Sequence, residues 1–157
     1  MERYLKSKLE GGSFGRVDPA RSLIMASIKG KSNKSTELTL RLVLVRAGVR
    51  GWRTHASELP GRPDFYFDDA RLAVFVDGCY WHGCWRCGHV PKTRSEFWSA
   101  KFERNRARDA HNNRRLRHMG IIVIRVWEHS LKTQLGRRQV LRRIDAKRYP
   151  EFNSVFG

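Results

Sequence analysis

The stretch "DFYFDDARLAVFVD", Asp64 to Asp77, carries the strongest fold signal in the sequence. Its first part, Asp64 to Asp68, follows the turn "LPGRP" and alternates polar and apolar residues in the manner of a β-strand. Its second part, Arg71 to Val76, is apolar without alternation, which is typical of a strand buried on both faces. The residues between them, Asp68 to Ala70, predict a tight turn. We therefore expect two neighbouring strands joined as a hairpin.

A helix is predicted on the N-terminal side of this hairpin, from Thr36 onward. Leu38, Leu42 and Val45 recur there at helical spacing, so they are expected to form its buried face. A strand between residues 49 and 55 is only weakly indicated. We expect the helix to pack on a sheet that contains the hairpin.

A long basic helix and another strand are predicted on the C-terminal side. Thr93 and Glu96 form a capping-box pattern ahead of a helix that ends near Met119, with Gly120 as its cap. The run "IIVIRVW", residues 121–127, predicts a second strongly buried strand, and a final amphipathic helix follows it. This order of elements predicts an α/β fold with a mixed sheet flanked by helices.

The chain of 157 residues has the length of a single domain. Residues 1–33 are rich in glycine, serine and lysine, so we expect a flexible basic arm there and one folded domain over residues 34–157. Neither an apolar run of the roughly 20 residues that span a bilayer nor a signal-peptide pattern is present in the sequence. We therefore expect no membrane contact and a cytoplasmic protein.

The charge of the chain points to a polyanionic partner. Lys and Arg number 32 against 15 acidic residues, which gives a net charge of +17 spread along the whole sequence. Such an excess favours nucleic acid as the partner. A soluble basic surface without a nucleic-acid partner is the alternative.

Two acids close the ends of the predicted hairpin strands. Asp64 begins the first strand and Asp77 follows the second, so both carboxylates can converge on one hard cation. The alternative for Asp64 is an ordinary turn residue after Pro63. Nucleases of the PD-(D/E)XK superfamily are built from strands in this way, and the arrangement resembles theirs.

The three cysteines of the chain lie within nine residues, at Cys79, Cys84 and Cys87. An odd number this close together argues against a disulfide framework, whereas the C-x-x-C loop suits tetrahedral zinc in a reducing compartment. Three histidines compete for the fourth position: His82, His89 and His129. A closed, sulfur-rich site of this kind would be structural.

Aromatic residues flank the cysteines and begin the long helix, notably Tyr80, Trp81 and Trp98. They can fill the core, or they can act as wedges between base pairs. Along the long helix, Asn105 and Asp109 share one face and are surrounded by arginines. That helix is either a solvated surface with internal ion pairs or a surface that follows DNA phosphates.

Five segments resemble one known family in order and spacing: "LPGRPDF", "AVFVDGCYWHGC", "VPKTRSEFW", "NRARD" and "IVIRVWE". They are similar to the very-short-patch-repair (Vsr) mismatch endonucleases over residues 28–132. The resemblance implies a restriction-endonuclease-like (PD-(D/E)XK type) fold with a structural zinc site. It also implies a Mg²⁺-dependent, strand-specific endonuclease that nicks duplex DNA 5′ of the thymine in a T:G mismatch, the product of 5-methylcytosine deamination.

The resemblance implies the following catalytic residues: Asp64, Asp77, His82, Glu37 and Asp109. The implied Mg²⁺ ligands are Asp64, Asp77 and the main-chain carbonyl of Val76. His82 matches the catalytic histidine of the family, Glu37 the acid near the metal-bound waters, and Asp109 an assisting helix acid. Asp77 stands where well-known members have a histidine as general base, so it is expected to position the water or to bind the metal.

The resemblance also assigns the zinc and DNA contacts. It favours His129, the residue after "VWE", as the ligand that joins Cys79, Cys84 and Cys87. The implied DNA-binding and intercalating residues are Tyr80, Trp81, Trp98, Asn105, Arg62, Lys92 and Arg94. Double-stranded DNA is the expected partner, and we expect a monomer that works beside DNA repair proteins in the prokaryotic nucleoid.

Two other functions stay open from the sequence. A family relative used for restriction or phage defence would cut unmismatched or modified DNA with the same catalytic residues. A zinc-stapled DNA-binding module without catalysis would keep the acids only for structure.

Overall fold

The structure is a computed structural model that describes residues 7, 35–88, 90–92 and 94–149. The hairpin predicted between Asp64 and Asp77 lies inside a four-stranded sheet with the order β1-β2-β3-β4. β2 (Phe65–Phe67) pairs antiparallel with β3 (Leu72–Asp77), and a turn that contains Ala70 joins them. The predicted hairpin is therefore confirmed.

The two outer strands complete a mixed sheet. β1 (Trp52–Thr54) pairs antiparallel with β2, and β4 (Ile122–Trp127) pairs parallel with β3. A parallel pair needs a crossover, and α3 (Ser95–His118) supplies it between β3 and β4. The predicted mixed α/β architecture is thus present in the described part of the chain.

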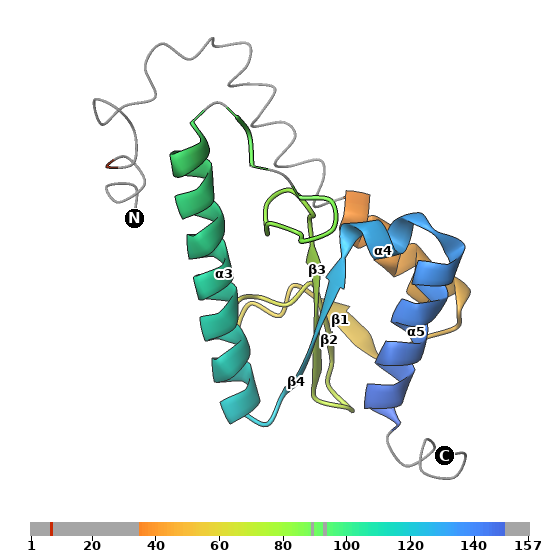
Figure 1. Ribbon diagram of the computed structural model, residues 1–157. Coiled ribbons are helices and arrows are strands. Elements are labelled where there is room, and N and C mark those ends of the chain that lie inside the picture. Colours follow the sequence, from red (N-terminus) through yellow and green to blue (C-terminus); the bar gives the residue numbers. More distant parts are fainter. Residues whose placement is uncertain (1–6, 8–34, 89, 93, 150–157) are drawn as a thin grey trace.

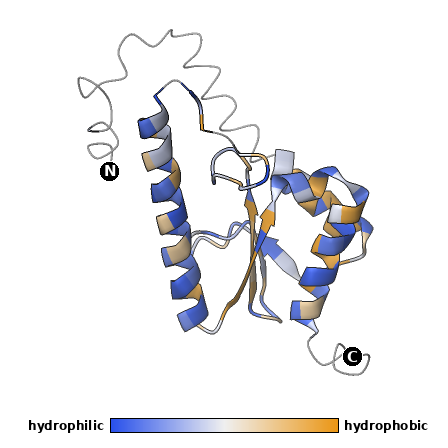
Figure 2. Ribbon diagram, in the orientation of Figure 1, coloured by the Kyte–Doolittle hydropathy of each residue, from blue (hydrophilic) through white to orange (hydrophobic). Residues whose placement is uncertain are grey.

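Helices cover both faces of the sheet (Figure 1). α3 lies on one face, and α5 (Gln134–Arg148) lies on the other, where the short α4 (Glu128–Lys132) connects it to β4. A helix over residues 35–46 packs on the same face as α5 through Leu40 and Leu44. Colouring by hydropathy shows apolar residues along β3 and β4, between helices that are largely hydrophilic (Figure 2).

The central strand β3 divides the core into two layers because its side chains alternate between the faces. Val74 and Val76 pack toward α5 and the helix over residues 35–46. Ala73 and Phe75 pack on the α3 side with Leu116 of that helix. All residues of β3 are buried, as the unbroken apolar sequence predicts.

The buried face of the helix over residues 35–46 differs from the prediction. Leu38, Leu42 and Val45 are 53%, 45% and 59% exposed, whereas Leu40 and Leu44 are fully buried. Leucines at 38, 40, 42 and 44 alternate along this helix, so both of its faces are apolar and either satisfies helical spacing. Contact with Phe65 and Val74 in the core selects the second face.

Two further details of the prediction are corrected. β4 is less buried than expected, with Ile122 38% exposed, because β4 is an edge strand. α3 begins at Ser95 after Arg94, a residue without a side-chain cap, while Thr93 of the expected capping box lies outside the described residues. At the other end, Gly120 has φ +70° and its N–H bonds to the carbonyl of Arg117, as expected of a C-terminal glycine.

The expected basic arm over residues 1–33 lies outside the described residues, apart from Ser7. Among the described residues, no helix is long and apolar enough to cross a bilayer.

Candidate functional site

Three groups of polar side chains lie where β2 begins and where β3 and β4 end. The acid–imidazole group consists of Glu37, His55 and Asp64. The buried charge network consists of Asp77, His82, Asp109 and Arg125. The thiol group consists of Cys79, Cys84, Cys87 and His129. Two of these groups offer ligand atoms for a metal ion.

The acid–imidazole group brings together three separate elements. Glu37 comes from the helix over residues 35–46, His55 follows β1, and Asp64 precedes β2. Their ligand atoms all lie within 4.8 Å of one another, and Nε2 of His55 is 3.2 Å from Oε1 of Glu37. Two carboxylates and an imidazole at these separations form a donor set that fits a divalent cation.

Asp64 is anchored beside the backbone of β3. The N–H of Val76 donates a hydrogen bond to Oδ2 of Asp64 at 2.7 Å. Burial raises the pKa of Asp64 to about 6, and the negative charges of Glu37 and Asp77 add to this rise, against the hydrogen bond from Val76. The carboxylates of Asp64, Glu37 and Asp77 therefore repel one another, and a bound cation would relieve that repulsion.

Asp77 is held by Arg125 and lies outside the acid–imidazole group. Nε of Arg125 donates to Oδ2 of Asp77 at 2.6 Å, and Nη2 donates to Oδ1. This bidentate pair occupies both oxygens of a carboxylate that is 3% exposed. Asp77 is therefore not among the ligand atoms grouped with Asp64, and a cation shared by the two acids stays a prediction. Arg125 lies on the neighbouring strand, with its guanidinium over the ring of Phe75.

His82 lies beside this ion pair and contacts Asp109 of α3. Its Nδ1 is 2.7 Å from Oδ2 of Asp109 and 3.7 Å from Oδ1 of Asp77. Arg125 also reaches Asp109, at 3.3 Å. A carboxylate on Nδ1 fixes the ring orientation and favours the tautomer with the proton on Nδ1, which leaves Nε2 as the basic nitrogen.

The charges of the network favour the ionised forms of Asp109 and Arg125. Burial raises the pKa of Asp109, but the hydrogen bond with His82 and the charges of Arg125 and Arg108 lower it by more, so its pKa lies below the ordinary value. For Arg125, burial lowers the pKa, and the bonds to Asp77 outweigh that effect and raise it overall. The lowered pKa of Asp109 keeps its carboxylate an acceptor at neutral pH.

The thiol group is closed around a small centre. Nδ1 of His129 lies 3.3, 3.4 and 3.5 Å from the sulfurs of Cys79, Cys84 and Cys87, and the last two sulfurs are 3.5 Å apart. Tetrahedral zinc, with bonds of about 2.3 Å to sulfur and about 2.0 Å to nitrogen, sets neighbouring ligand atoms roughly 3.5–3.8 Å apart. The donor set therefore fits a Cys3His metal site.

Of the three competing histidines, the structure brings only His129 to the cysteines among the described residues. His82 is engaged with Asp109, and His89 lies outside the described residues. Burial raises the pKa of Cys79 to about 12, and a hydrogen bond with Cys87 adds to this rise, so a cation is needed to hold the Cys79 thiol as a thiolate. The N–H of Cys79 donates to Glu128, which orients the loop toward His129.

The predicted intercalating aromatics form one packed cluster. Tyr80 makes edge contacts with Trp81, Trp98 and Phe102 at centroid distances of 5.0, 5.6 and 5.8 Å. The ammonium of Lys101 lies 5.1 Å and 4.8 Å from the ring centres of Trp81 and Trp98. Tyr80, Trp81 and Trp98 are half-buried, so each keeps an accessible part, and a positive charge lies next to Trp81 and Trp98.

The other predicted DNA-contacting residues occupy different positions. Asn105 donates its side-chain N–H to the carbonyl of Trp81 at 2.8 Å, so it fixes the aromatic loop to α3. Arg62, Lys92 and Arg94 are exposed, and Arg62 lies in the β1–β2 connection, two residues before Asp64. These three cations are therefore accessible to a phosphate.

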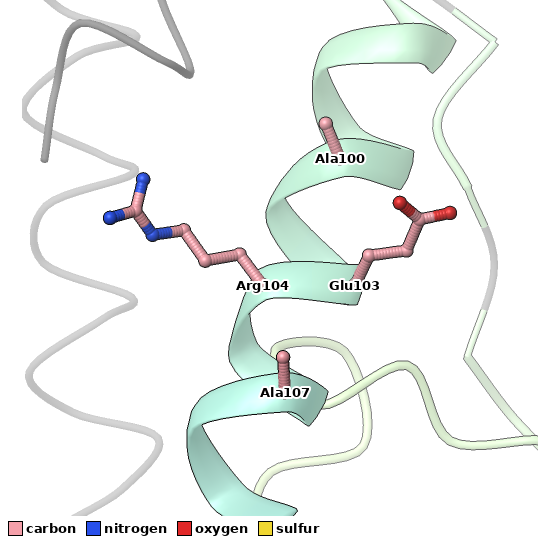
Figure 3. Close-up of a pocket in the computed structure, with 4 residues that line it drawn as sticks. All are labelled: Ala100, Glu103, Arg104 and Ala107. Atoms are coloured by element: carbon pink, nitrogen blue, oxygen red, sulfur yellow. The ribbon is translucent and has the colours of Figure 1, made fainter. Parts of the chain in front are cut away.

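An open hollow of about 380 Å³ lies on α3, lined by Ala100, Glu103, Arg104 and Ala107 (Figure 3). At 3.6 residues per turn, these residues lie on the side of the helix opposite Asn105 and Asp109. None of them belongs to the three groups above. The hollow is a surface feature that is separate from the ionisable groups.

A mixed sheet with carboxylates at its strand ends, next to a carboxylate-held imidazole and in a strongly basic chain, defines the class of α/β nucleases. Residues 17–87 match the model of the DNA mismatch endonuclease Vsr family. The chain is 41% identical over 119 residues to the type II nicking enzyme V.XorIIP of Xanthomonas oryzae, which covers 74% of this chain and 85% of that protein. It is 36% identical over 109 residues to the DNA mismatch endonuclease Vsr of Escherichia coli. That alignment covers 68% of this chain and 69% of the Escherichia coli protein. The chain belongs to the Vsr family and is a DNA endonuclease.

Sequence reasoning missed two residues of these groups and a third residue that contacts one of them. His55 falls in a segment with only a weak strand signal, and its proximity to Glu37 and Asp64 arises from the pairing of β1 with β2. Arg125 is a lone cation in an apolar run, which indicates a buried acidic partner, but the identity of that partner, Asp77, follows only from the register of β3 and β4. Glu128 could not be inferred, because its contact with Cys79 crosses 49 positions.

Proposed function

We propose that this endonuclease is Mg²⁺-dependent and nicks one strand of duplex DNA at T:G mismatches. The observation that carries the proposal is the placement of Asp64 within a cation-sized group, with the His82–Asp109 pair supplied by the adjoining loop and α3. The family membership supports the same reaction. Residues 34–157 act as a single endonuclease domain in this proposal.

The residues of the site divide the work of phosphodiester hydrolysis. Asp64, with the main-chain carbonyl of Val76, would hold the cation, and Glu37 would accept hydrogen bonds from water bound to it. The cation, when bound, neutralises charge on the scissile phosphate and acidifies water. His82 accepts or orients a proton through Nε2 while Asp109 holds Nδ1.

The ion pair with Arg125 supports a positioning role for Asp77 in place of metal binding. Arg125 bridges Asp77 and Asp109, so it fixes the carboxylate that in turn holds His82. Asp77 then acts through its neighbours and does not touch the cation.

We propose that the thiol group holds a structural Zn²⁺. Cys79 and Cys84 flank His82 in the sequence, and the N–H of Cys84 bonds to the carbonyl of Cys79 at 2.9 Å. A metal ion bound by cysteines on both sides of His82 would restrict the motion of the loop that carries His82. Zinc and the catalytic histidine thus share one loop, which explains why the cysteines lie so close to the active-site residues.

We propose that duplex DNA lies across the aromatic cluster and the basic side of α3. Half-buried rings can enter a base step at a cost of a few kcal/mol, and that cost is lower where pairing is already weak. Arg62, Lys92 and Arg94 supply phosphate contacts in this proposal. Affinity should therefore fall steeply with salt.

The substrate assay that tests this proposal uses four end-labelled duplexes with Mg²⁺. They are identical except that one is perfect, one carries T:G, one carries a different mismatch and one is methylated. The proposal requires a nick 5′ of the thymine of T:G on that strand alone. Equal cutting of the perfect or methylated duplex would instead assign a restriction-type activity, and binding without any cutting would assign a DNA-binding module.

A further inference from the structure

His55 is the one member of the acid–imidazole group that the proposed reaction does not use. Its Nε2 faces Oε1 of Glu37 at 3.2 Å, and its ligand atom lies within 4.8 Å of that of Asp64. Its side chain is 59% exposed, so burial in the core does not account for its position. The imidazole instead lies at the open side of a pair of acids.

The backbone directs His55 to this place. His55 follows the last pair of the β1–β2 ladder, Thr54 with Phe65, and its N–H bonds to the carbonyl of Asp64 at 3.3 Å. Its φ of +53° ends the strand and turns the chain away from the ladder. His55 therefore lies opposite Asp64, and its side chain stays near the start of β2.

The donor set defined by these residues differs from an all-oxygen site. Mg²⁺ takes oxygen ligands in near-octahedral geometry, at about 2.1 Å, so its ligand atoms lie about 3.0 Å apart in cis and about 4.2 Å apart in trans. Three donors within 4.8 Å of one another can close to such distances by small side-chain movements. An imidazole among them favours first-row transition metals, whose affinity for nitrogen exceeds that of Mg²⁺.

We propose that His55 is a direct ligand of the cation at Asp64 and makes this site prefer Mn²⁺ to Mg²⁺. The inference rests on the proposed cation site and extends it to a residue and a metal preference of this chain. The rival explanation is that a protonated His55 only forms an ion pair with Glu37. In that case the imidazole contributes charge and no metal bond.

Metal binding, measured without DNA, separates these explanations. Zinc-loaded full-length protein is titrated with Mn²⁺ and with Mg²⁺ by calorimetry, so that the thiol group is already filled. The test variant is His55→Asn, because asparagine tolerates a positive φ better than other non-glycine residues. His118→Asn, at the exposed end of α3, is the matched control. The ratio of Mn²⁺ to Mg²⁺ affinity should fall by about tenfold in the His55 variant and stay unchanged in the control.

A spectroscopic measurement identifies the ligand atom. Pulsed electron paramagnetic resonance of bound Mn²⁺ should show ¹⁴N coupling from a coordinated imidazole in the wild-type protein and in His118→Asn, and none in His55→Asn. Retained ¹⁴N coupling in His55→Asn, or no coupling in the wild type while Asp64→Ala abolishes Mn²⁺ binding, overturns the role of His55 and leaves the proposed function standing. Unchanged Mn²⁺ binding in Asp64→Ala overturns the cation site itself.

Discussion

The Nδ1 atom of His82 lies 2.7 Å from Oδ2 of Asp109, although 27 positions separate the two residues in the sequence. His82 belongs to the cysteine-containing loop after β3, and Asp109 to the middle of α3. The contact therefore links the thiol group, the buried charge network and the long helix. It gives the loop a fixed partner on a rigid element.

Replacement of Asp109 should impair the chemical step without affecting DNA binding. We expect Asp109→Asn to lower the single-turnover nicking rate by about 10–100-fold, since an orienting carboxylate of this kind contributes that much to the group it holds. Asp145→Asn on the exposed side of α5 is the control and should be neutral. A rate within twofold of the wild type in Asp109→Asn would remove Asp109 from the site.

The raised pKa of Asp64 predicts a pH-dependent effect on stability. Since its pKa rises from the ordinary 3.8 to about 6 through burial, the protonated form is favoured in the folded state. That contribution is fully present below about pH 4 and is lost as the pH rises through about 6. In zinc-loaded protein without other divalent cations, Asp64→Asn should raise the free energy of unfolding at pH 8 by about 1–3 kcal/mol.

Urea denaturation at pH 4.5 and at pH 8 checks this prediction. The gain in Asp64→Asn should shrink at the lower pH, where the wild-type carboxyl is already protonated. Mg²⁺ should stabilise the wild type and have little effect on the variant. Equal effects of the substitution at both pH values would show that burial does not control the charge of Asp64.

The Asp77–Arg125 pair should behave as a coupled buried unit. Arg125→Met leaves the carboxylate of Asp77, which is 3% exposed, without its partner and should cost about 3–5 kcal/mol of unfolding free energy. The double variant Asp77→Asn with Arg125→Met should recover part of that loss, because no unpaired charge remains. Additive effects of the two substitutions in a double-mutant cycle would contradict the ion pair, and Arg138→Met on α5 serves as the exposed control.

Metal content tests the thiol group directly. We expect one zinc per chain by mass spectrometry of the purified protein, and loss of that zinc in Cys84→Ser with a lowered melting temperature. Arg86→Ala, an exposed non-ligand in the same loop, should retain the metal. Stable, fully active Cys84→Ser protein without zinc would contradict a structural metal at this position.

Much of this fold could be predicted from the strand pattern, because that pattern is contained in short stretches of sequence. The unbroken apolar run of β3 predicts a buried strand, and the residues before it predict a tight turn. The structure confirms the strand and the turn. The leucines at 38, 40, 42 and 44 allow two interpretations of which helix face is buried, because their alternation makes both faces apolar. Only the packing against Phe65 selects one face, and packing is not visible in a short window of sequence.

The site divides in a similar way. The cysteines could be grouped from their spacing, and His129 was favoured by its place after "VWE". Asp77 is predicted to share a cation with Asp64 because strand ends converge, but that pattern does not reveal that Arg125 bonds to the carboxylate of Asp77. The pairing of Arg125 with Asp77 depends on the parallel register of β3 and β4, which places Arg125 opposite Phe75. Contacts of that kind follow from the register and not from the motif.

Cleavage by Asp64→Asn is the measurement that tests the central claim most directly. Wild-type protein and the variant are compared on the T:G duplex with saturating Mg²⁺, under single-turnover conditions, together with the dissociation constant for the same duplex. The account predicts a loss of nicking of about 10³-fold or more with affinity unchanged within about threefold, because Asp64 holds the cation that the phosphate needs. Nicking by the variant at the wild-type rate would contradict it.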